Sequence, residues 1–383
     1  MARKTLAILL ISVFATSLGY GIIAPLLPLY AEDLGATGVW VGIIFSAFAA
    51  SRALVMPIMG RLSDEYGRRN FIIVGLLAYT VFSLCYIFAS SVYTLTLIRL
   101  LHGVASAIVT PVAMAYLGDI VPPGREGEFM GRFNTFFFIG FALGPLLAGY
   151  ITENYYIDIS FYIMGGLGAL GLIMSALFLP ESPSYKKTKQ APFGLLLRDS
   201  CMQGIFILRA VQSIGIAAYM SFLPIYSQRI ELAYSQIGLL LGVTYILWAM
   251  MNHPFGILAD KYDRPIMMVS GSVIMAVAIF LIPFSTTFFE LFAIVLSRAV
   301  GGAIVLAAAT AMTTQIGREH GMGSTMGIFN TSMAVGMLLG GVISGSVMDY
   351  IGLNYVFYMA SFYYILGVVA FWWLVVVRGK RGN

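Results

Sequence analysis

Long apolar segments separated by short polar ones dominate the chain. Twelve apolar stretches of roughly 20 residues are each long enough to cross the ~30 Å hydrocarbon core of a bilayer. In lipid a crossing segment must satisfy its own backbone hydrogen bonds, which predicts helices. The first stretch is too long for a signal peptide, so we expect it to be retained. The predicted spans lie near residues 5–30, 39–59, 70–90, 93–117, 130–152, 158–180, 200–228, 235–257, 265–284, 288–313, 325–348 and 354–377.

The pattern repeats at a constant offset of 196 residues. Residues 27–30 (LPLY) return at 223–226 (LPIY), and residues 130–135 (MGRFNT) return at 326–331 (MGIFNT). Such a repeat predicts two pseudo-symmetric six-helix bundles, at 1–180 and 199–383. The only long polar segment, 181–198, is then a cytoplasmic linker. Since six is even, both bundles enter the membrane in the same sense, with a pathway between them.

Composition and charge agree with a membrane protein. Sixty per cent of the residues are hydrophobic and 10% are charged, which excludes a soluble globular chain. Seventeen of the 22 Lys and Arg residues fall on one side of the predicted spans, four lie within spans and one is on the other side. By the positive-inside rule both termini are cytoplasmic, in the cytoplasmic or plasma membrane. The net charge of +5 is therefore a topology signal, and no nucleic-acid partner is expected.

Three motifs resemble those of the major facilitator superfamily. Residues 60–69 (GRLSDEYGRR) are similar to its loop signature G-x-L-x-D-x-x-G-R-R/K. Residues 99–103 (RLLHG) are similar to R-x-x-Q-G, with His102 in place of Gln. Residues 131–149 resemble G-x8-G-x3-G-P-x2-G-G, with Ala148 in place of one Gly. The resemblance implies the major facilitator fold, an all-α membrane protein of two bundles. The third motif favours the twelve-helix drug:proton antiporter branch.

The resemblance also implies a conformational latch between spans two and three. Asp64 and Arg68 are four residues apart and can pair on a helical turn, and Asp119 could accept from Arg68. The alternative is a surface loop that only obeys the positive-inside rule. The second-half copy is degraded, with no acid to match Asp119, so we expect one latch, in the first half. Its candidate residues are Gly60, Asp64, Gly67, Arg68, Arg69 and Asp119.

Small residues on spans five and eleven predict close helix contacts. Without side chains the helices can approach closely, and in lipid such packing drives association. Simple packing and a pliable gate at the bundle interface both remain open. The candidates for this gate packing are Gly140, Gly144, Pro145, Gly149, Gly336 and Gly340.

Four arginines lie within spans, where each costs roughly 2.5–3.5 kcal/mol at a helix centre, so we expect them to face the protein interior. No Asp or Glu lies in the middle of a span, which leaves water, carbonyls, amides or an anionic ligand as partners. Arg99 and His102 project on one face and are candidates for coupling, although a packing histidine is the alternative. The substrate-cavity candidates are Tyr20, Arg52, Asn134, Arg209, Tyr219, Trp248, Arg298 and Asn330.

The function that these features favour is secondary active transport by alternating access. We expect a proton-coupled exporter, an antiporter, of drugs or similar amphipathic small molecules. The alternative is a transporter of an organic anion, sugar phosphate or lipid headgroup bound by Arg52 and Arg209. A sensor is disfavoured, because we expect no appended soluble domain that could pass on a signal. A membrane enzyme is also disfavoured, because the spans hold no paired carboxylates, metal-ligand cluster or nucleophile–His motif. We expect no cofactor and no metal, a small-molecule substrate, protons as coupling ion, the lipid bilayer as surroundings and a monomeric chain.

Overall fold

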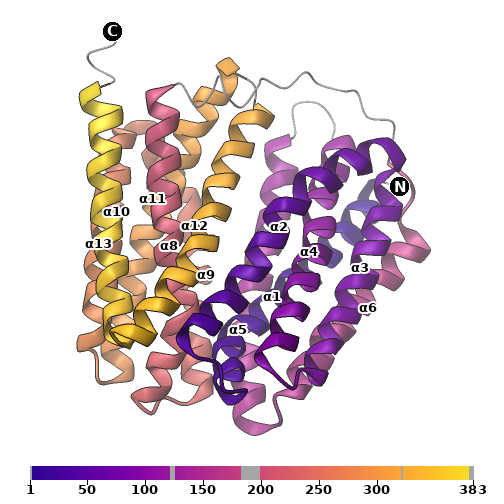
Figure 1. The fold of residues 1–383 in the computed structure, drawn as a ribbon. Coiled ribbons are helices and arrows are strands. Elements are labelled where there is room, and N and C mark those ends of the chain that lie inside the picture. The colour runs from indigo at the N-terminus through magenta and orange to yellow at the C-terminus, as the bar shows by residue number, and fades with distance from the viewer. Residues whose placement is uncertain (1, 121–125, 183–198, 321, 379–383) are drawn as a thin grey trace. The chain divides into compact units, whose positions relative to one another are not determined.

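The computed structural model describes residues 2–120, 126–182, 199–320 and 322–378, which contain helices and no strand. The twelve predicted spans are confirmed, because twelve described helices are long and apolar enough to cross a membrane. Short 3₁₀ turns follow two of them, at Tyr86–Phe88 and Ile282–Phe284, and a π-helical segment follows the last helix at Trp373–Arg378. The helices are α1 (Ala2–Asp33), α2 (Gly38–Tyr66), α3 (Arg68–Cys85), α4 (Val92–Ile120), α5 (Glu126–Asn154), α6 (Asp158–Phe178), α8 (Ser200–Arg229), α9 (Tyr234–Lys261), α10 (Arg264–Leu281), α11 (Phe288–His320), α12 (Met322–Tyr350) and α13 (Leu353–Trp372) (Figure 1).

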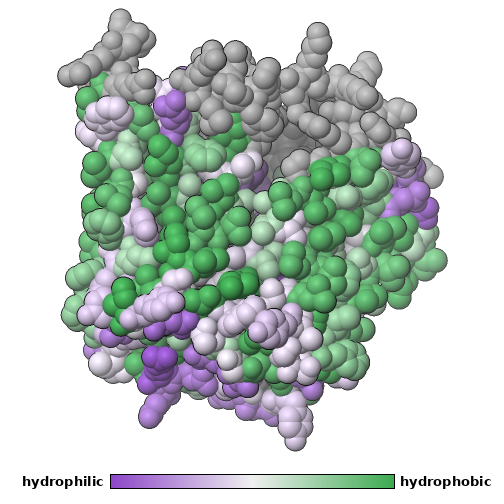
Figure 2. Space-filling model, viewed as in Figure 1, coloured by the Kyte–Doolittle hydropathy of each residue, from purple (hydrophilic) through white to green (hydrophobic). Residues whose placement is uncertain are grey.

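Apolar side chains cover the flanks of these helices. Leu54, Phe88 and Phe289 are among many large hydrophobic residues that are more than half exposed. Figure 2 shows this hydrophobic surface along the helices, with hydrophilic side chains gathered near helix ends. A water-facing protein rarely carries contiguous apolar patches of this size, so these flanks face lipid. The chain is therefore an integral, multi-pass membrane protein.

The chain forms two compact units, and the first contains residues Met1–Ala36, Ala47–Lys187 and Ser227–Tyr245. Helix α1 lies against α4, α5 and α6, and α3 packs on α4 and α6. A Cβ atom at Gly140 would lie 2.1 Å from Ser17 Oγ, and one at Gly144 would lie 2.5 Å from Gly21 Cα. Glycine is therefore required where α5 crosses α1.

The second unit contains residues Thr37–Ser46, Thr188–Tyr226 and Ile246–Asn383. Helix α10 lies against α11 and α13, and α12 contacts both of these helices. A Cβ at Gly336 would lie 2.0 Å from the Ala210 carbonyl oxygen, and one at Gly340 would lie 2.6 Å from Ile214 Cα. Helices α8 and α12 thus repeat the glycine packing of α1 and α5 at the same offset of 196.

Candidate functional site

A buried ion pair joins the start of α3 to the end of α4. Arg68 Nε contacts Asp119 Oδ2, and Arg68 Nη2 donates to Asp119 Oδ1 at 3.3 Å. The Arg68 and Asp119 side chains are 3% and 5% exposed. Arg68 Nη1 also donates to Ser63 Oγ of α2 at 3.3 Å. Because the guanidinium fork matches a carboxylate in two places, this pair fixes the orientation of three helices as well as neutralising the charge.

Glu181, which sequence reasoning assigned only to the linker, belongs to the same cluster. Its Oε1 accepts from the backbone N–H groups of Arg68 at 2.8 Å and Arg69 at 3.2 Å, the first free donors of α3. Gly67 precedes them with φ of 92°, and a Cβ there would lie 2.8 Å from Glu181 Oε2. Glycine at 67 thus serves both the backbone turn and the approach of this carboxylate.

The last turn of α6 and the segment that follows it both form hydrogen bonds with this cluster. Ser182 Oγ donates to Asp119 Oδ2 at 2.9 Å, and Arg69 Nη2 donates to the Ala176 carbonyl at 2.7 Å. In the sequence, the only indication of this role was that Glu181, an acidic residue, directly follows Pro180 at the end of a span. Of the other predicted latch positions, Gly60 and the Asp64 side chain lie outside the described part of the structure, although both belong to α2.

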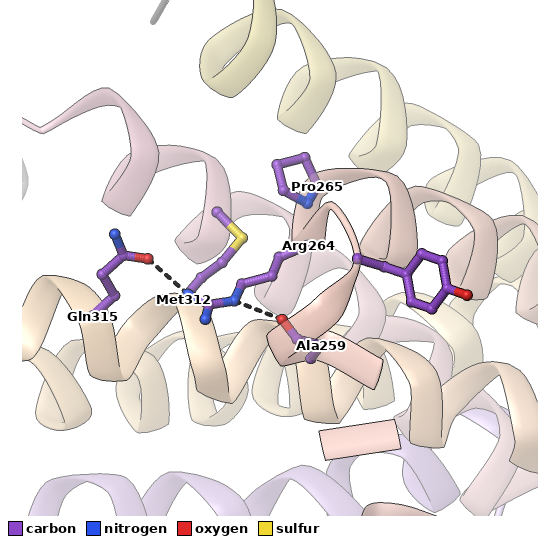
Figure 3. A pocket seen from close by; sticks show the side chains of 6 residues that line it. Ala259, Arg264, Pro265, Met312 and Gln315 are labelled. Atoms are coloured by element: carbon purple, nitrogen blue, oxygen red, sulfur yellow. Dashed lines mark hydrogen bonds between the residues drawn. The ribbon is translucent and has the colours of Figure 1, made fainter. Parts of the chain in front are cut away.

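The second half carries a neutral counterpart of this ion pair. Arg264 stands 196 residues after Arg68, and Gln315 stands 196 residues after Asp119. Arg264 Nη1 donates to Gln315 Oε1 at 2.6 Å, and Arg264 Nε donates to the Ala259 carbonyl at 2.9 Å (Figure 3). These residues line a pocket of about 360 Å³ together with Tyr262, Pro265 and Met312. The helix-end contact is retained here with an amide in place of the carboxylate.

A buried polar cluster lies inside the first unit. His102 Nδ1 and the Tyr86 hydroxyl are 3.1 Å apart, and Arg99 Nη1 donates to the same hydroxyl at 3.4 Å. Arg99 lies 4.3 Å from the centre of the Phe48 ring, and the Tyr79 ring packs 4.6 Å from His102. Arg99 is 1% and His102 0% exposed. One tyrosine hydroxyl therefore links a cation to a titratable imidazole.

The arginines of the second unit pack mainly against aromatic and sulfur-containing side chains. Arg298 is fully buried with its guanidinium carbon 3.8 Å from the centre of the Tyr219 ring. Its guanidinium group also interacts with the Tyr364 side chain. Arg209 is 4.9 Å from the Phe329 ring centre, and its Nη2 is 3.5 Å from Met333 Sδ. Cation–π contacts thus partly replace the missing carboxylates.

Comparison with known proteins identifies the family. The family model described as Major Facilitator Superfamily matches residues 9–253 and 205–383. The chain belongs to the major facilitator superfamily.

Similar proteins match this superfamily member over nearly its whole length. An uncharacterised MFS-type transporter of Methanocaldococcus jannaschii is 34% identical over 96% of this chain and 98% of its own. The quinolone resistance protein NorA of Staphylococcus aureus is 26% identical over 96% and 95%. A crystal structure of a bacterial homologue of the human lysosomal transporter Spinster has a TM-score of 0.85 at 14% identity, covering 96% of each chain. The protein is therefore a membrane transporter, with the fold predicted from its motifs.

The remaining candidate residues of the transporter are dispersed. In the first unit Tyr20 packs 5.0 Å from Phe48 and 4.6 Å from Phe141, measured between ring centres, and Arg52 is half-buried. Asn134 and Asn330 are both exposed. In the second unit Trp248 Nε1 donates to the Ala299 carbonyl at 3.0 Å. No group of three His, Cys, Asp or Glu suited to a metal ion occurs among the described residues.

Proposed function

We propose that this transporter is a proton-coupled exporter of drugs or similar amphipathic small molecules. The observation that carries the proposal is the similarity to a quinolone resistance protein, which extends over 96% of the chain at 26% identity. The motif on α5 that resembles the drug:proton antiporter branch points the same way. We further propose that both termini are cytoplasmic, that the protein works as a monomer and that it operates by alternating access.

The cluster of Arg99, His102 and Tyr86 is the coupling site in this proposal. An imidazole can exchange a proton where no carboxylate is at hand, and its Nδ1 already contacts the Tyr86 hydroxyl at 3.1 Å. Gaining a proton there places two cations around one hydroxyl, which disfavours the packed arrangement. A shift in this packing is a direct means of linking proton binding to the helices that carry the cluster.

Transport by the purified protein in liposomes tests this function. We expect a fluorescent amphipathic cation to accumulate against its gradient when a pH gradient is imposed, and to stop when an ionophore collapses that gradient. His102→Gln should retain substrate exchange at equilibrium and lose the gradient-driven accumulation. Tyr79→Phe is the matched control, because it keeps the ring beside His102 and removes only the bond to the Thr16 carbonyl. Accumulation that ignores the pH gradient would contradict proton coupling.

A second candidate function is transport of an organic anion. It is favoured by the arginines of the second unit, whose guanidinium groups face aromatic rings and sulfur where a carboxylate is absent among the described residues. Arg209→Ala discriminates the two, since it should abolish uptake of an anionic dye and leave that of a cationic dye intact. Equal transport of the anionic dye by Arg209→Ala excludes this candidate.

A further inference from the structure

Two acidic residues at the C-terminal ends of helices hold the N-terminal ends of other helices. In the first unit Glu153, at the end of α5, accepts from the Ser235 backbone N–H at the start of α9, at 2.9 Å. In the second unit Asp349, at the end of α12, accepts from the N–H groups of Gly38 at 2.5 Å and Val39 at 2.8 Å, at the start of α2. Each carboxylate therefore caps a helix that is distant in sequence.

The two contacts are copies of each other under the internal repeat. Asp349 follows Glu153 by 196 residues, and Ser235 follows Val39 by the same number. The offset that pairs Arg68 with Arg264 thus also relates these caps. Both copies of the cap have an acidic residue, whereas Asp119 in the first half is replaced by Gln315 in the second.

Helix electrostatics explain why these acids are specific to their partners. The free N–H groups and the positive end of the macrodipole make a helix start favourable for a carboxylate. Glu153 and Asp349 lie at the negative ends of their own helices, where an acid is unfavourable. Each carboxylate is therefore stabilised by the start of the neighbouring helix. This stabilisation is lost if that helix moves away.

Backbones touch directly beneath both caps. A Cβ at Gly149 would lie 2.4 Å from the Tyr234 carbonyl oxygen, and one at Gly345 would lie 2.2 Å from that of Gly38. Gly345 follows Gly149 by 196 residues, so glycine occupies the equivalent position in both copies of the repeat. Deeper along α2, Ser46 Oγ donates to the Leu338 carbonyl of α12 at 2.8 Å.

We propose that Glu153 and Asp349 are equivalent positioning residues, one in each unit, and that each holds a helix contact that acts as a gate in the transport cycle. In the first unit, Glu153 lies at the helix end opposite the Arg68–Asp119 cluster. Helix α5 starts on the side where α4 ends and rises roughly 40 Å to Glu153. The Glu153 cap holds α5 onto α9 and the Asp349 cap holds α12 onto α2, and each cap breaks when the transport cycle separates its two helices. The inference rests on alternating access and is independent of the substrate and the coupling ion.

Thiol accessibility of a buried reporter tests the gate. The reporter is Ser46→Cys, which is 3% exposed in the parent, in a chain whose native cysteines are replaced by Cys85→Ser and Cys201→Ser. A membrane-impermeant maleimide is added to each side of the proteoliposomes in turn. We expect Glu153→Gln combined with Asp349→Asn to raise the labelling rate at least about fivefold, the population change for roughly 1 kcal/mol.

Glu290→Gln is the matched control on another helix. Its Oε2 accepts from the Thr286 and Thr287 N–H groups at 2.8 and 3.2 Å, so it caps only the start of its own helix, α11. Its labelling rate should stay at that of the parent. Asp349→Asn alone is measured as well, in case the double variant does not fold, and Asp349→Glu should restore slow labelling. Equal labelling rates of the reporter in the Asp349→Asn and Glu290→Gln variants would overturn the proposed gate. The assay does not depend on drug transport, so a failure of the proposed function would leave its result unchanged.

Discussion

Arg68 and Arg264 occupy equivalent positions and experience different surroundings. Arg68 is buried against the Asp119 carboxylate, whereas Arg264 bonds the Gln315 amide on the exposed surface of a pocket. Removing one partner of a buried ion pair leaves an uncompensated charge in a region with little water. Removing a neutral partner at an exposed site lets water take its place. The same substitution at the two positions therefore has different consequences.

Asp119→Ala should destabilise the protein by about 3–5 kcal/mol, the range for breaking a buried pair. Gln315→Ala, its matched control, should cost about 0.5–1.5 kcal/mol, as for an ordinary hydrogen bond. The measurement is the free energy of unfolding in detergent micelles for both variants beside the parent. Equal losses in the two variants would show that the Arg68–Asp119 pair adds nothing beyond a neutral contact.

At the scale of helices, direct backbone contact is the recurring feature. Helix α5 approaches α1 at Gly144, and α12 approaches α8 at Gly340, with no side chain between them. Close approach increases dispersion contacts, which drive helix association in lipid where burial of apolar surface gives no advantage. The spacing of these glycines predicted close packing, and the partners became known only from the fold.

Gly144→Ala should destabilise the protein by about 1–3 kcal/mol, because its methyl group would overlap the backbone of Gly21. Gly166→Ala on α6 is the matched control, since a Cβ there meets nothing within 4 Å. The control should be neutral or slightly stabilising. Thermal unfolding of both variants in the same detergent compares them, and a similar midpoint for the two would contradict a tight α1–α5 contact.

The spans were predictable from the sequence because their length and apolarity leave a chain in lipid only one regular structure. The boundaries agree closely, as with the span expected near 158–180 and observed in α6 at Asp158–Phe178. The role of Glu181 was not predictable, because a polar residue after a helix gives no indication of which backbone N–H groups it reaches. Likewise, the Tyr86 hydroxyl that links Arg99 to His102 lies 13 residues before the motif it serves.

At the scale of the whole molecule, the distribution of charge predicts the orientation of the protein in the membrane. Seventeen Lys and Arg residues fall on one side of the spans and one on the other, and from this bias we propose that the basic side lies in the cytoplasm. The offset of 196 residues predicts the same sense in the membrane for both halves. Together these two features predict on which side of the membrane each helix end lies.

Epitope tags at both termini should therefore be cleaved from the cytoplasmic face only. Protease added to intact cells or right-side-out vesicles should spare these tags, and opening the membrane should expose them. A tag inserted between α5 and α6, after Tyr155, should show the reverse behaviour and is the internal control. Cleavage of a terminal tag in intact vesicles would overturn the assigned orientation.

Gln315, in the place where the first half has Asp119, also has a consequence for how the chain tolerates change. The two halves still match at a fixed offset, but equivalent positions at their helix ends differ in how strongly a substitution destabilises the protein. In a library that samples every substitution, losses should concentrate around Arg68, Asp119 and Glu181, while the mirrored positions near Arg264 remain permissive. Under selection for a new substrate, substitutions at these helix ends should therefore accumulate in the second half and be eliminated from the first half.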